Sequence, residues 1–305
     1  MESRYITPVV TIFDDKGRVD IEQNIRVYDS LKGKVSGFVT MGSTGEFFAL
    51  NMQSSKTLID LCGRYPKEEM RVYAGASRLD VQESVELANY AYEKGIDGVM
   101  IISPYYFPLD DEDVFRFYST IAAKTSANIF IYNFPERTGY SVSPDVCLRL
   151  ADKYPNIIGL KDTIPDTTHT AQVIETVKTR LPHFEVYAGY DNNFAHVVLS
   201  GGNGCIGGLS NIVPQFFASW MQAFIQGDLA LVAKHQQRVD QLMAIYGVNA
   251  PFIPTFKKAL QLKGVVNSDY CTAPFIGLNN IQIEQLQQLL TLADSPLWPF
   301  LNQTQ

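Results

Sequence analysis

Eight short apolar runs, separated by longer amphipathic stretches, are the feature of this sequence that most constrains its fold. The runs are rich in β-branched and aromatic residues, and most are apolar continuously rather than at alternate positions. Strands that are buried on both faces, as in a parallel sheet, have this composition. The eight predicted strands are Ile6–Phe13, Gly37–Met41, Arg71–Ala76, Gly98–Ser103, Ile129–Asn133, Ile157–Lys161, Glu185–Gly189 and Gly204–Leu209.

The stretches between the runs have the spacing of helices that pack on a sheet. In one of them, apolar residues recur on one helical face at Val81, Val85, Ala88 and Tyr92. Eight strand–helix units that close on themselves form a (β/α)8 TIM barrel, an α/β fold. An open, doubly wound sheet is the alternative, but no G-x-G-x-x-G motif follows the first run. We therefore expect a barrel.

The strand pattern stops at about residue 226, and the rest of the chain has helical patterns only. Helices are expected over Asp228–Tyr246, Thr255–Lys263 and Ile281–Ala293. The sequence thus predicts a barrel over residues 1–226 and a C-terminal helical region over residues 227–305.

Composition excludes several classes of partner. The net charge of −7, with no run of Lys or Arg, argues against nucleic acid and anionic membranes. The sequence has neither a stretch of about 20 apolar residues nor an N-terminal signal peptide.

Four scattered histidines give no metal-ligand spacing. Four cysteines without a C-x-x-C pair are expected to be reduced thiols in a cytoplasmic protein. These are Cys62, Cys147, Cys205 and Cys271.

In a barrel, the active site lies at the C-terminal ends of the strands. The second run leads into Ser43 and Thr44 between two glycines, whose hydroxyls and backbone N–H groups could bind a small carboxylate. An ordinary strand-to-helix turn would look the same. The fifth run ends at Tyr132, a possible proton relay, and Arg137 follows, which could grip a carboxylate. Each of these residues alone could equally be structural.

The sixth run ends in Lys161, which is harder to explain structurally. A lysine at the end of an apolar strand is either exposed or buried at a cost in desolvation. Its neutral amine would attack a carbonyl carbon, and a 2-keto acid would then form an iminium that accepts electrons from the cleaved bond. Ser43 and Thr44 would hold the carboxylate of such a substrate, and Tyr132 would move protons. These residues come from three different strands, as barrel active sites usually do.

The seventh run ends at Gly189 and is followed by Asp191 and Asn192. These two polar side chains could hydrogen-bond the hydroxyls of a polyol tail, or they could cap the next helix, a position that both residue types favour.

Five motifs in order are similar to those of the dihydrodipicolinate synthase/N-acetylneuraminate lyase family. They are G-S-T-G-E at 42–46, S-P-Y-Y at 103–106, Y-N-F-P at 132–135, G-L-K-D at 159–162 and G-Y-D at 189–191. The resemblance spans residues 8 to about 214. It implies a class I, pyruvate-dependent aldolase with a (β/α)8 barrel and a C-terminal helical region. It further implies a tetramer built as a dimer of dimers, and no cofactor, since the substrate itself forms the Schiff base.

The resemblance also implies a role for each matching residue. Lys161 matches the Schiff-base lysine, and Tyr132 matches the tyrosine that relays protons over the substrate. Ser43 and Thr44 match the pair that binds the carboxylate of pyruvate. Tyr106 matches a tyrosine that reaches across the tight dimer interface in dihydrodipicolinate synthases.

The residues that match the substrate-specificity positions point in different directions. Ile206 matches a residue whose backbone lines the pyruvate site, and Thr163 and Asp191 match residues near the polyol tail of sialic acid lyases. Asn192 replaces the acidic residue that those lyases usually carry, which argues against sialic acid. Arg137 resembles the arginine that grips aspartate semialdehyde in dihydrodipicolinate synthases.

The preferred hypothesis is a lyase that cleaves a 2-keto-3-deoxy sugar acid to pyruvate and an aldehyde. The alternatives are 4-hydroxy-tetrahydrodipicolinate synthase, N-acetylneuraminate lyase and a keto-deoxy acid dehydratase. A non-enzymatic barrel that binds a keto acid for regulation is also open, but such a protein would need neither Lys161 nor Tyr132.

Overall fold

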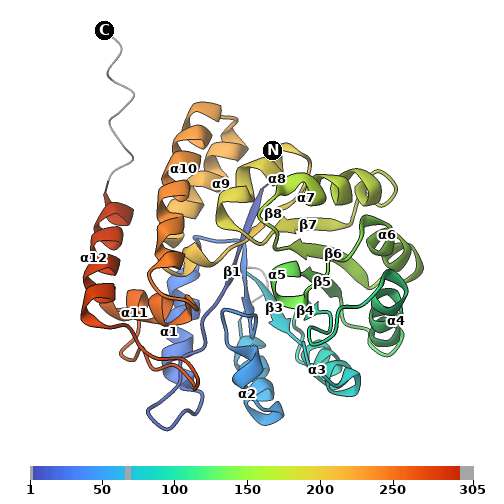
Figure 1. The fold of residues 1–305 in the computed structure, drawn as a ribbon, viewed down its shortest axis with the longest axis horizontal. Helices are drawn as coiled ribbons and strands as arrows, with labels where there is room; N and C mark the ends of the chain where they lie inside the picture. The colour runs from blue at the N-terminus through green and yellow to red at the C-terminus, as the bar shows by residue number, and fades with distance from the viewer. Residues whose placement is uncertain (1–2, 66–69, 296–305) are drawn as a thin grey trace.

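The computed structural model describes residues 3–65 and 70–295 and contains a closed barrel of eight parallel strands. The strands pair in chain order, and β8 pairs with β1 to close the barrel (Figure 1). The predicted barrel is confirmed. The strands are β1 Arg4–Pro8, β2 Gly37–Thr40, β3 Arg71–Gly75, β4 Gly98–Ile102, β5 Ile129–Asn133, β6 Ile157–Asp162, β7 Glu185–Ala188 and β8 Gly204–Ile206.

A ring of helices surrounds the strands (Figure 1). The helices up to the end of the barrel are α1 Ile21–Leu31, α2 Met52–Cys62, α3 Val81–Glu93, α4 Asp111–Ala122, α5 Pro135–Thr138, α6 Pro144–Lys153, α7 Thr167–Val173, α8 Phe194–Leu199 and α9 Pro214–Gln226. Shorter helical segments are η1 Phe47–Ala49, η2 Ile174–Lys178, η3 Asp191–Asn193 and η4 Gly208–Asn211. Side-chain caps start most of the longer helices, for example Asp80 at α3 and Ser143 at α6.

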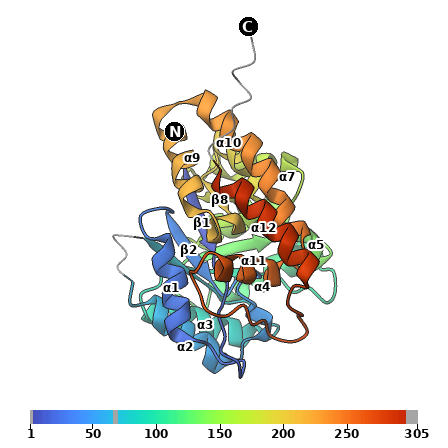
Figure 2. The ribbon, with the colours of Figure 1, turned by 90° about the vertical axis from the view of Figure 1, so that its left-hand side faces the viewer.

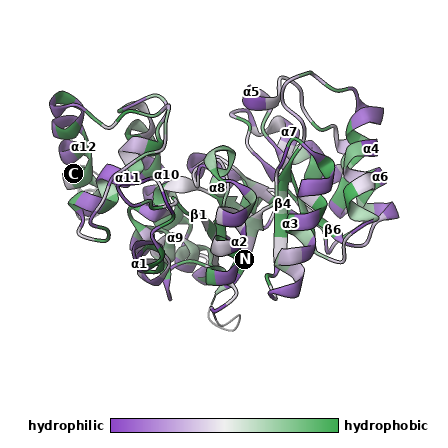
Figure 3. Cartoon of the chain, turned by 90° about the horizontal axis from the view of Figure 1, so that it is seen from below, coloured by the Kyte–Doolittle hydropathy of each residue, from purple (hydrophilic) through white to green (hydrophobic). Residues whose placement is uncertain are grey.

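The core has two layers, because each strand is buried on both faces. One layer fills the inside of the barrel, and the other lies between the strands and the helices. Apolar colour follows the strands, whereas polar colour marks the outer faces of the helices (Figure 3). The inner layer consists of Ile6, Val39, Tyr73, Met100, Ile102, Phe130, Tyr132, Tyr187 and Ile206.

The first and last strands differ from their predicted bounds. β1 begins at Arg4, whose guanidinium pairs with Glu185 at the start of β7, so a charged residue lies inside the N-terminal end of the barrel. β8 ends at Ile206 because the N–H groups of Gly208 and Leu209 donate to side chains, at 3.1 and 3.0 Å, and not to a neighbouring strand. Apolar composition alone could not reveal either effect.

The C-terminal helices lie along one side of the barrel, next to α1 and α9 (Figures 1 and 2). They are α10 Leu229–Leu242, η5 Met243–Gly247, α11 Ile253–Leu262 and α12 Asn280–Asp294. The side chain of Gln23 in α1 accepts from the backbone N–H of Asn267, at 2.7 Å, which ties this region to the barrel. The division at residue 226 stays a prediction, and residues 296–305 of the predicted helical region lie outside the described residues.

Within the described part of the chain, no helix has both the length and the apolar character needed to cross a membrane.

Candidate active site

A cavity of about 220 Å³ lies at the C-terminal ends of the strands, where the sequence places the active site. Eight of the eleven predicted site residues line it: Ser43, Thr44, Tyr132, Arg137, Lys161, Thr163, Gly189 and Ile206. We call it the keto-acid cavity. Met243, Tyr246 and Phe252 also line it, although they belong to the C-terminal helical region.

Lys161 and Tyr132 are neighbours across β6 and β5. The two residues are paired in the register of the two strands, and both line the cavity at the end of the barrel. Lys161 is 5% exposed, and its Nζ lies 4.3 Å from the centroid of the Tyr132 ring. Over residues 3–65 and 70–295, no carboxylate forms an ion pair with this amine. The Tyr132 hydroxyl lies 3.3 Å from Ser43 Oγ, so the amine of Lys161, the phenol of Tyr132 and the hydroxyl of Ser43 belong to one cluster.

The loop after β2 has the features of an anion site. No group of the described residues accepts a hydrogen bond from the backbone N–H of Ser43 or Thr44. Met41 and Glu46 on either side have left-handed φ angles of 55° and 56°, which fold the loop back on itself. Gly45 N–H donates to the Gly42 carbonyl at 3.0 Å. Both residues line the cavity, and together they offer two hydroxyls and two N–H groups without a partner in the described chain, which is the kind of donor set that a bound carboxylate requires.

Thr163 has a free hydroxyl next to the lysine. The residue is 6% exposed, and its Oγ1 has no hydrogen-bond partner within the described residues. A Cβ on Gly189 would lie 1.9 Å from this Oγ1, so only glycine leaves room for it. The sequence predicts Gly189 as a substrate-binding residue at the end of a strand, and the structure shows a physical reason for a glycine at this position. An unpaired buried hydroxyl is available to bind a polar group of a substrate.

Arg137 lies at the mouth of the cavity. Its guanidinium is 5.3 Å from the centroid of the Phe134 ring, and no carboxylate pairs with it within the described ranges. Beside it, the Tyr190 hydroxyl donates to Glu136 at 3.2 Å. Burial, and then the charge of Glu136, raise the pKa of Tyr190 to about 12. Sequence reasoning did not identify Glu136 or Tyr190, although Tyr190 stands within the G-Y-D motif.

Asp191 does not line the cavity, and the predicted contact with a substrate hydroxyl is corrected. Asp191 is fully buried and accepts hydrogen bonds from the Tyr5 hydroxyl, from Leu209 N–H at 3.0 Å and from the Tyr246 hydroxyl at 2.7 Å. Burial raises its pKa, against these hydrogen bonds. Tyr246 lines the cavity, so Asp191 holds a residue of the cavity wall in place and does not itself line the cavity.

Two other predicted residues also lie outside the cavity. The side chain of Asn192 is not among the lining groups, and its backbone carbonyl accepts from Gln236 at 2.9 Å. Tyr106 is 83% exposed and packs edge-on against Phe107, with ring centroids 4.9 Å apart. Its role across a dimer interface needs a second chain and stays a prediction.

A histidine–aspartate pair lies next to Lys161, between a half-buried histidine in α7 and a buried aspartate in β6. His169 Nδ1 is 2.8 Å from Asp162 Oδ2, and Nε2 is 3.0 Å from the Val142 carbonyl oxygen. Since both neighbours accept hydrogen bonds, both ring nitrogens donate, as in the imidazolium form. Asp162 also accepts from Asn133 and Thr170, each at 2.7 Å. The pair thereby connects β5, β6 and α7.

This pair predicts a dependence of stability on pH. Burial lowers the pKa of His169, but the hydrogen bond and charge of Asp162 and the Val142 carbonyl outweigh it, so the pKa lies above 6.5. Because the pKa of His169 is higher in the folded chain than in the unfolded chain, protonated His169 stabilises the fold. This stabilisation is complete at a pH below the pKa of the unfolded chain, and it is lost as the pH rises through the pKa of the folded chain. In urea unfolding, wild type should exceed His169→Gln in stability by more at about pH 6 than at about pH 9. An equal difference at both pH values would contradict this.

Within residues 3–65 and 70–295, no group of three or more His, Cys, Asp or Glu side chains could hold a metal ion.

Comparison with known proteins places this geometry in a family. The profile of the Dihydrodipicolinate synthetase family matches residues 1–293. The chain is 33% identical to YagE of Escherichia coli K12, provisionally named a 2-dehydro-3-deoxy-D-gluconate aldolase, over 93% of this chain and 95% of that protein. The crystal structure of YagE in complex with pyruvate superposes with a TM-score of 0.91, at 32% identity, over 95% of this chain and 98% of YagE.

Two further relatives carry different names. YjhH of Escherichia coli K12, provisionally named a 2-dehydro-3-deoxy-D-pentonate aldolase, is 32% identical over 95% of this chain and 96% of its own length. A 4-hydroxy-tetrahydrodipicolinate synthase of Nitratidesulfovibrio vulgaris is 30% identical over 94% of this chain and 97% of its own length. Since the family profile spans nearly the whole chain and these relatives cover it at 30% identity or more, the chain belongs to the dihydrodipicolinate synthetase family.

Proposed function

We propose that this chain is a class I aldolase that forms a Schiff base between Lys161 and a 2-keto acid. We further propose that it cleaves a 2-keto-3-deoxy sugar acid to pyruvate and an aldehyde. The observation that carries the proposal is the buried Lys161 amine, which has no counter-ion among the described residues and lies 4.3 Å from the centroid of the Tyr132 ring. The names of YagE and YjhH, and the pyruvate bound in the YagE crystal structure, support it.

The side chains divide the steps of such a reaction between them. The substrate carboxylate binds at the N–H groups and hydroxyls of Ser43 and Thr44. Lys161 Nζ attacks the keto carbon, and water leaves to form the iminium. Tyr132 takes the proton of the C4 hydroxyl as the C3–C4 bond breaks, which releases the aldehyde. The remaining enamine is protonated at C3, and water hydrolyses the iminium to pyruvate.

Borohydride trapping tests the covalent step. Reduction of the protein in the presence of pyruvate, followed by peptide mass mapping, should place one pyruvate-derived adduct on the peptide that contains Lys161. An adduct on another lysine, or none at all, would overturn the mechanism.

Arg137 favours a second candidate function, 4-hydroxy-tetrahydrodipicolinate synthase, because its guanidinium, which pairs with no carboxylate in the described part of the chain, could hold the carboxylate of aspartate semialdehyde. Cleavage of 2-keto-3-deoxygluconate should be compared with condensation of pyruvate and aspartate semialdehyde. Faster condensation would favour the synthase.

Replacing Arg137 with alanine separates these functions further. If Arg137 binds a second carboxylate, Arg137→Ala should cost about 2–5 kcal/mol in kcat/KM with an aldehyde that carries a carboxylate. The same variant should change kcat/KM with a neutral aldehyde by less than about 1 kcal/mol. Equal losses with both aldehydes would show that the variant acts through the fold of the loop.

We also propose that the chain works in the cytoplasm as a homotetramer, a dimer of dimers, on a small-molecule keto acid. The exposed aromatic side chains of Tyr106 and Phe107, 83% and 70% exposed, support an interface at this corner. A gel-filtration mass near that of one chain would contradict the tetramer.

A further inference from the structure

Hydrolysis of an iminium on Lys161 needs a base that takes a proton from the attacking water. In the reaction proposed above, Tyr132 serves the C4 hydroxyl, and Ser43 and Thr44 hold the substrate carboxylate. The other polar side chains that line the keto-acid cavity are Glu136, Arg137, Thr163, Tyr190 and Tyr246. The two phenols in this set each donate a hydrogen bond to a carboxylate, and such a pair can accept a proton from water.

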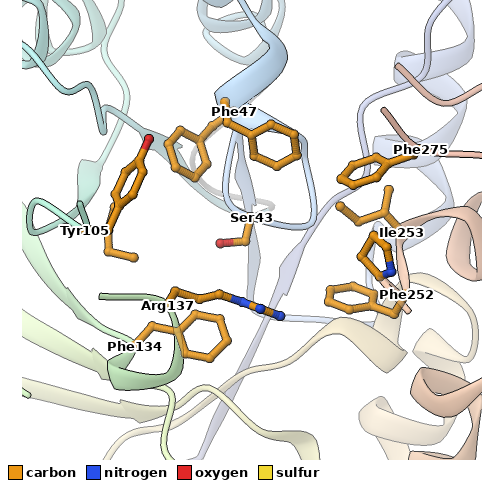
Figure 4. Close-up of a pocket in the computed structure, with 11 residues that line it drawn as sticks. Ser43, Phe47, Tyr105, Phe134, Arg137, Phe252, Ile253 and Phe275 are labelled. Atoms are coloured by element: carbon orange, nitrogen blue, oxygen red, sulfur yellow. The ribbon is translucent and has the colours of Figure 1, made fainter. Parts of the chain in front are cut away.

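One of these pairs, Tyr190 with Glu136, lies at the mouth of the cavity. Glu136 is exposed, and the guanidinium of its neighbour Arg137 extends toward Phe252 in the adjoining cavity (Figure 4). Desolvation is what makes a carboxylate a stronger base, and an exposed carboxylate lacks it. The mouth pair is therefore less suited to activating a water molecule in the interior.

The other pair, Tyr246 with Asp191, is shielded from solvent at the carboxylate. Asp191 is fully buried, and no Lys, Arg or His of the described residues forms an ion pair with it. A buried carboxylate without a counter-ion is costly, and neutral groups could link the same elements without that cost. Burial raises the pKa of Asp191, so its carboxylate accepts a proton more readily than that of an ordinary aspartate.

Two glycines that follow β8 make room for this pair. A Cβ on Gly207 would lie 2.5 Å from Asp191 Oδ1, and a Cβ on Gly208 would lie 2.5 Å from the Tyr246 hydroxyl oxygen. Gly208 lines the cavity and donates its N–H to that oxygen at 3.1 Å. The phenol gives its proton to Asp191 and one lone pair to Gly208, so its second lone pair remains for a donor in the cavity, such as water.

We propose that Tyr246 and Asp191 form a second proton relay, which activates the water that hydrolyses the iminium on Lys161. The proposal rests on the Schiff-base function proposed above. Water adds to the iminium carbon, and the C=N electron pair moves to nitrogen. The water gives one proton to the Tyr246 oxygen while the Tyr246 proton moves to Asp191.

Release of pyruvate returns the relay to its starting state. The C–N bond breaks and its electron pair stays on the Lys161 nitrogen, while the electrons of the O–H bond form the carbonyl group. The nitrogen takes the hydroxyl proton and the proton that Asp191 returns through Tyr246. Both protons of the water thus end on the amine, and no oxidant or reductant is needed.

A pulse–chase measurement on the Schiff base tests the relay. Enzyme saturated with carbon-13-labelled pyruvate is mixed with a large excess of unlabelled pyruvate, and samples are reduced with borohydride at successive times. The labelled adduct on the Lys161 peptide then decays with the rate constant of hydrolysis and release. Tyr246→Phe, which keeps the ring and removes the oxygen, should slow this decay by about 10²-fold.

Two further variants separate the relay from packing. Asp191→Asn should slow the decay by at least about tenfold, because an amide cannot take up the proton. Tyr5→Phe is the matched control, since Tyr5 donates to the same carboxylate but does not line the cavity. It should slow the decay by less than about threefold.

Deuterium content gives a readout that a distorted site would not produce. In deuterated water, a longer-lived Schiff base exchanges more of its C3 hydrogens before it is hydrolysed. Tyr246→Phe should therefore release pyruvate that carries more deuterium per molecule than the pyruvate released early by the wild type. A general loss of site geometry would instead lower the exchange at C3, and that result would overturn the relay.

The outcomes separate the two proposals. An adduct on Lys161 whose decay is unchanged in Tyr246→Phe would overturn the relay and leave the proposed function standing. Equal slowing by Tyr246→Phe and Tyr5→Phe would also overturn it. Slowing by Glu136→Gln in place of Tyr246→Phe would assign the water to the mouth of the cavity, again against the relay. Absence of any adduct on Lys161 in the wild type would overturn both proposals.

Discussion

Replacing Lys161 with methionine is expected to lower kcat/KM for keto-acid cleavage by a factor on the order of 10⁴ to 10⁶, the range found when a covalent catalyst is removed. Methionine has a similar length but no amine, so it cannot form the iminium. The fold should survive, because the Lys161 amine has no ion pair within residues 3–65 and 70–295 and lies against the Tyr132 ring. Pyruvate release, measured with lactate dehydrogenase, and urea unfolding check both parts.

Two further variants give this experiment its controls. Lys161→Arg keeps the positive charge, but a guanidinium does not form a Schiff base, so its activity should be as low as that of Lys161→Met. Lys153→Met removes an exposed lysine at the end of α6 and should retain full activity. Residual activity in Lys161→Met within about tenfold of wild type would show that the amine is not the nucleophile.

The sequence predicts the barrel and the proposed catalytic pair, Lys161 and Tyr132, for the same physical reason. Buried parallel strands are apolar along their whole length, so a polar residue at the end of such a run stands out. Lys161 and Tyr132 stand out in this way, and their neighbouring strands bring them together in register. Residues that arrive from distant parts of the chain give no such signal. Tyr246 and Phe252 line the cavity from the C-terminal helical region, and no local pattern in the sequence marks them.

Periodicity alone places most of the inner face of α3 correctly but misses one edge of it. Val81, Val85 and Ala88 belong to or pack against the core, whereas Tyr92 is 55% exposed. The buried face also includes Ser84, whose hydroxyl accepts from Arg78 N–H at 3.0 Å and is therefore paired in the interior. A pattern built from apolar residues cannot detect a buried polar residue of this kind. Asp191 was misassigned for a similar reason, because its three buried donors lie far from it in the sequence.

The second large effect concerns Lys257 in α11, which forms a fully buried ion pair with Glu46. Glu46 ends the loop that contains Ser43 and Thr44, and its Oε2 also accepts from the Thr272 hydroxyl at 2.8 Å. Lys257 donates to the Tyr270 carbonyl at 2.9 Å. The C-terminal region therefore holds the proposed carboxylate loop from outside the barrel.

Lys257→Met should lower the free energy of unfolding by about 3–5 kcal/mol, because it leaves the Glu46 carboxylate buried without a counter-charge. The loop would then be freer to leave the geometry that the carboxylate of the keto acid requires, so KM for that substrate should rise more than kcat falls. Urea unfolding, followed by circular dichroism, measures the first effect, and steady-state kinetics at a temperature where the variant is folded measures the second.

A double variant shows whether the unpaired charge is the cause. Glu46→Gln combined with Lys257→Met removes both charges, and it should recover most of the stability that Lys257→Met loses, since a neutral pair avoids the desolvation of a lone carboxylate. If the double variant were as unstable as the sum of the two single variants, the loss would come from packing around Phe13, whose ring centroid lies 4.6 Å from Lys257 Nζ. Recovery of stability with KM still raised would assign Glu46 a separate role in orienting the carboxylate loop.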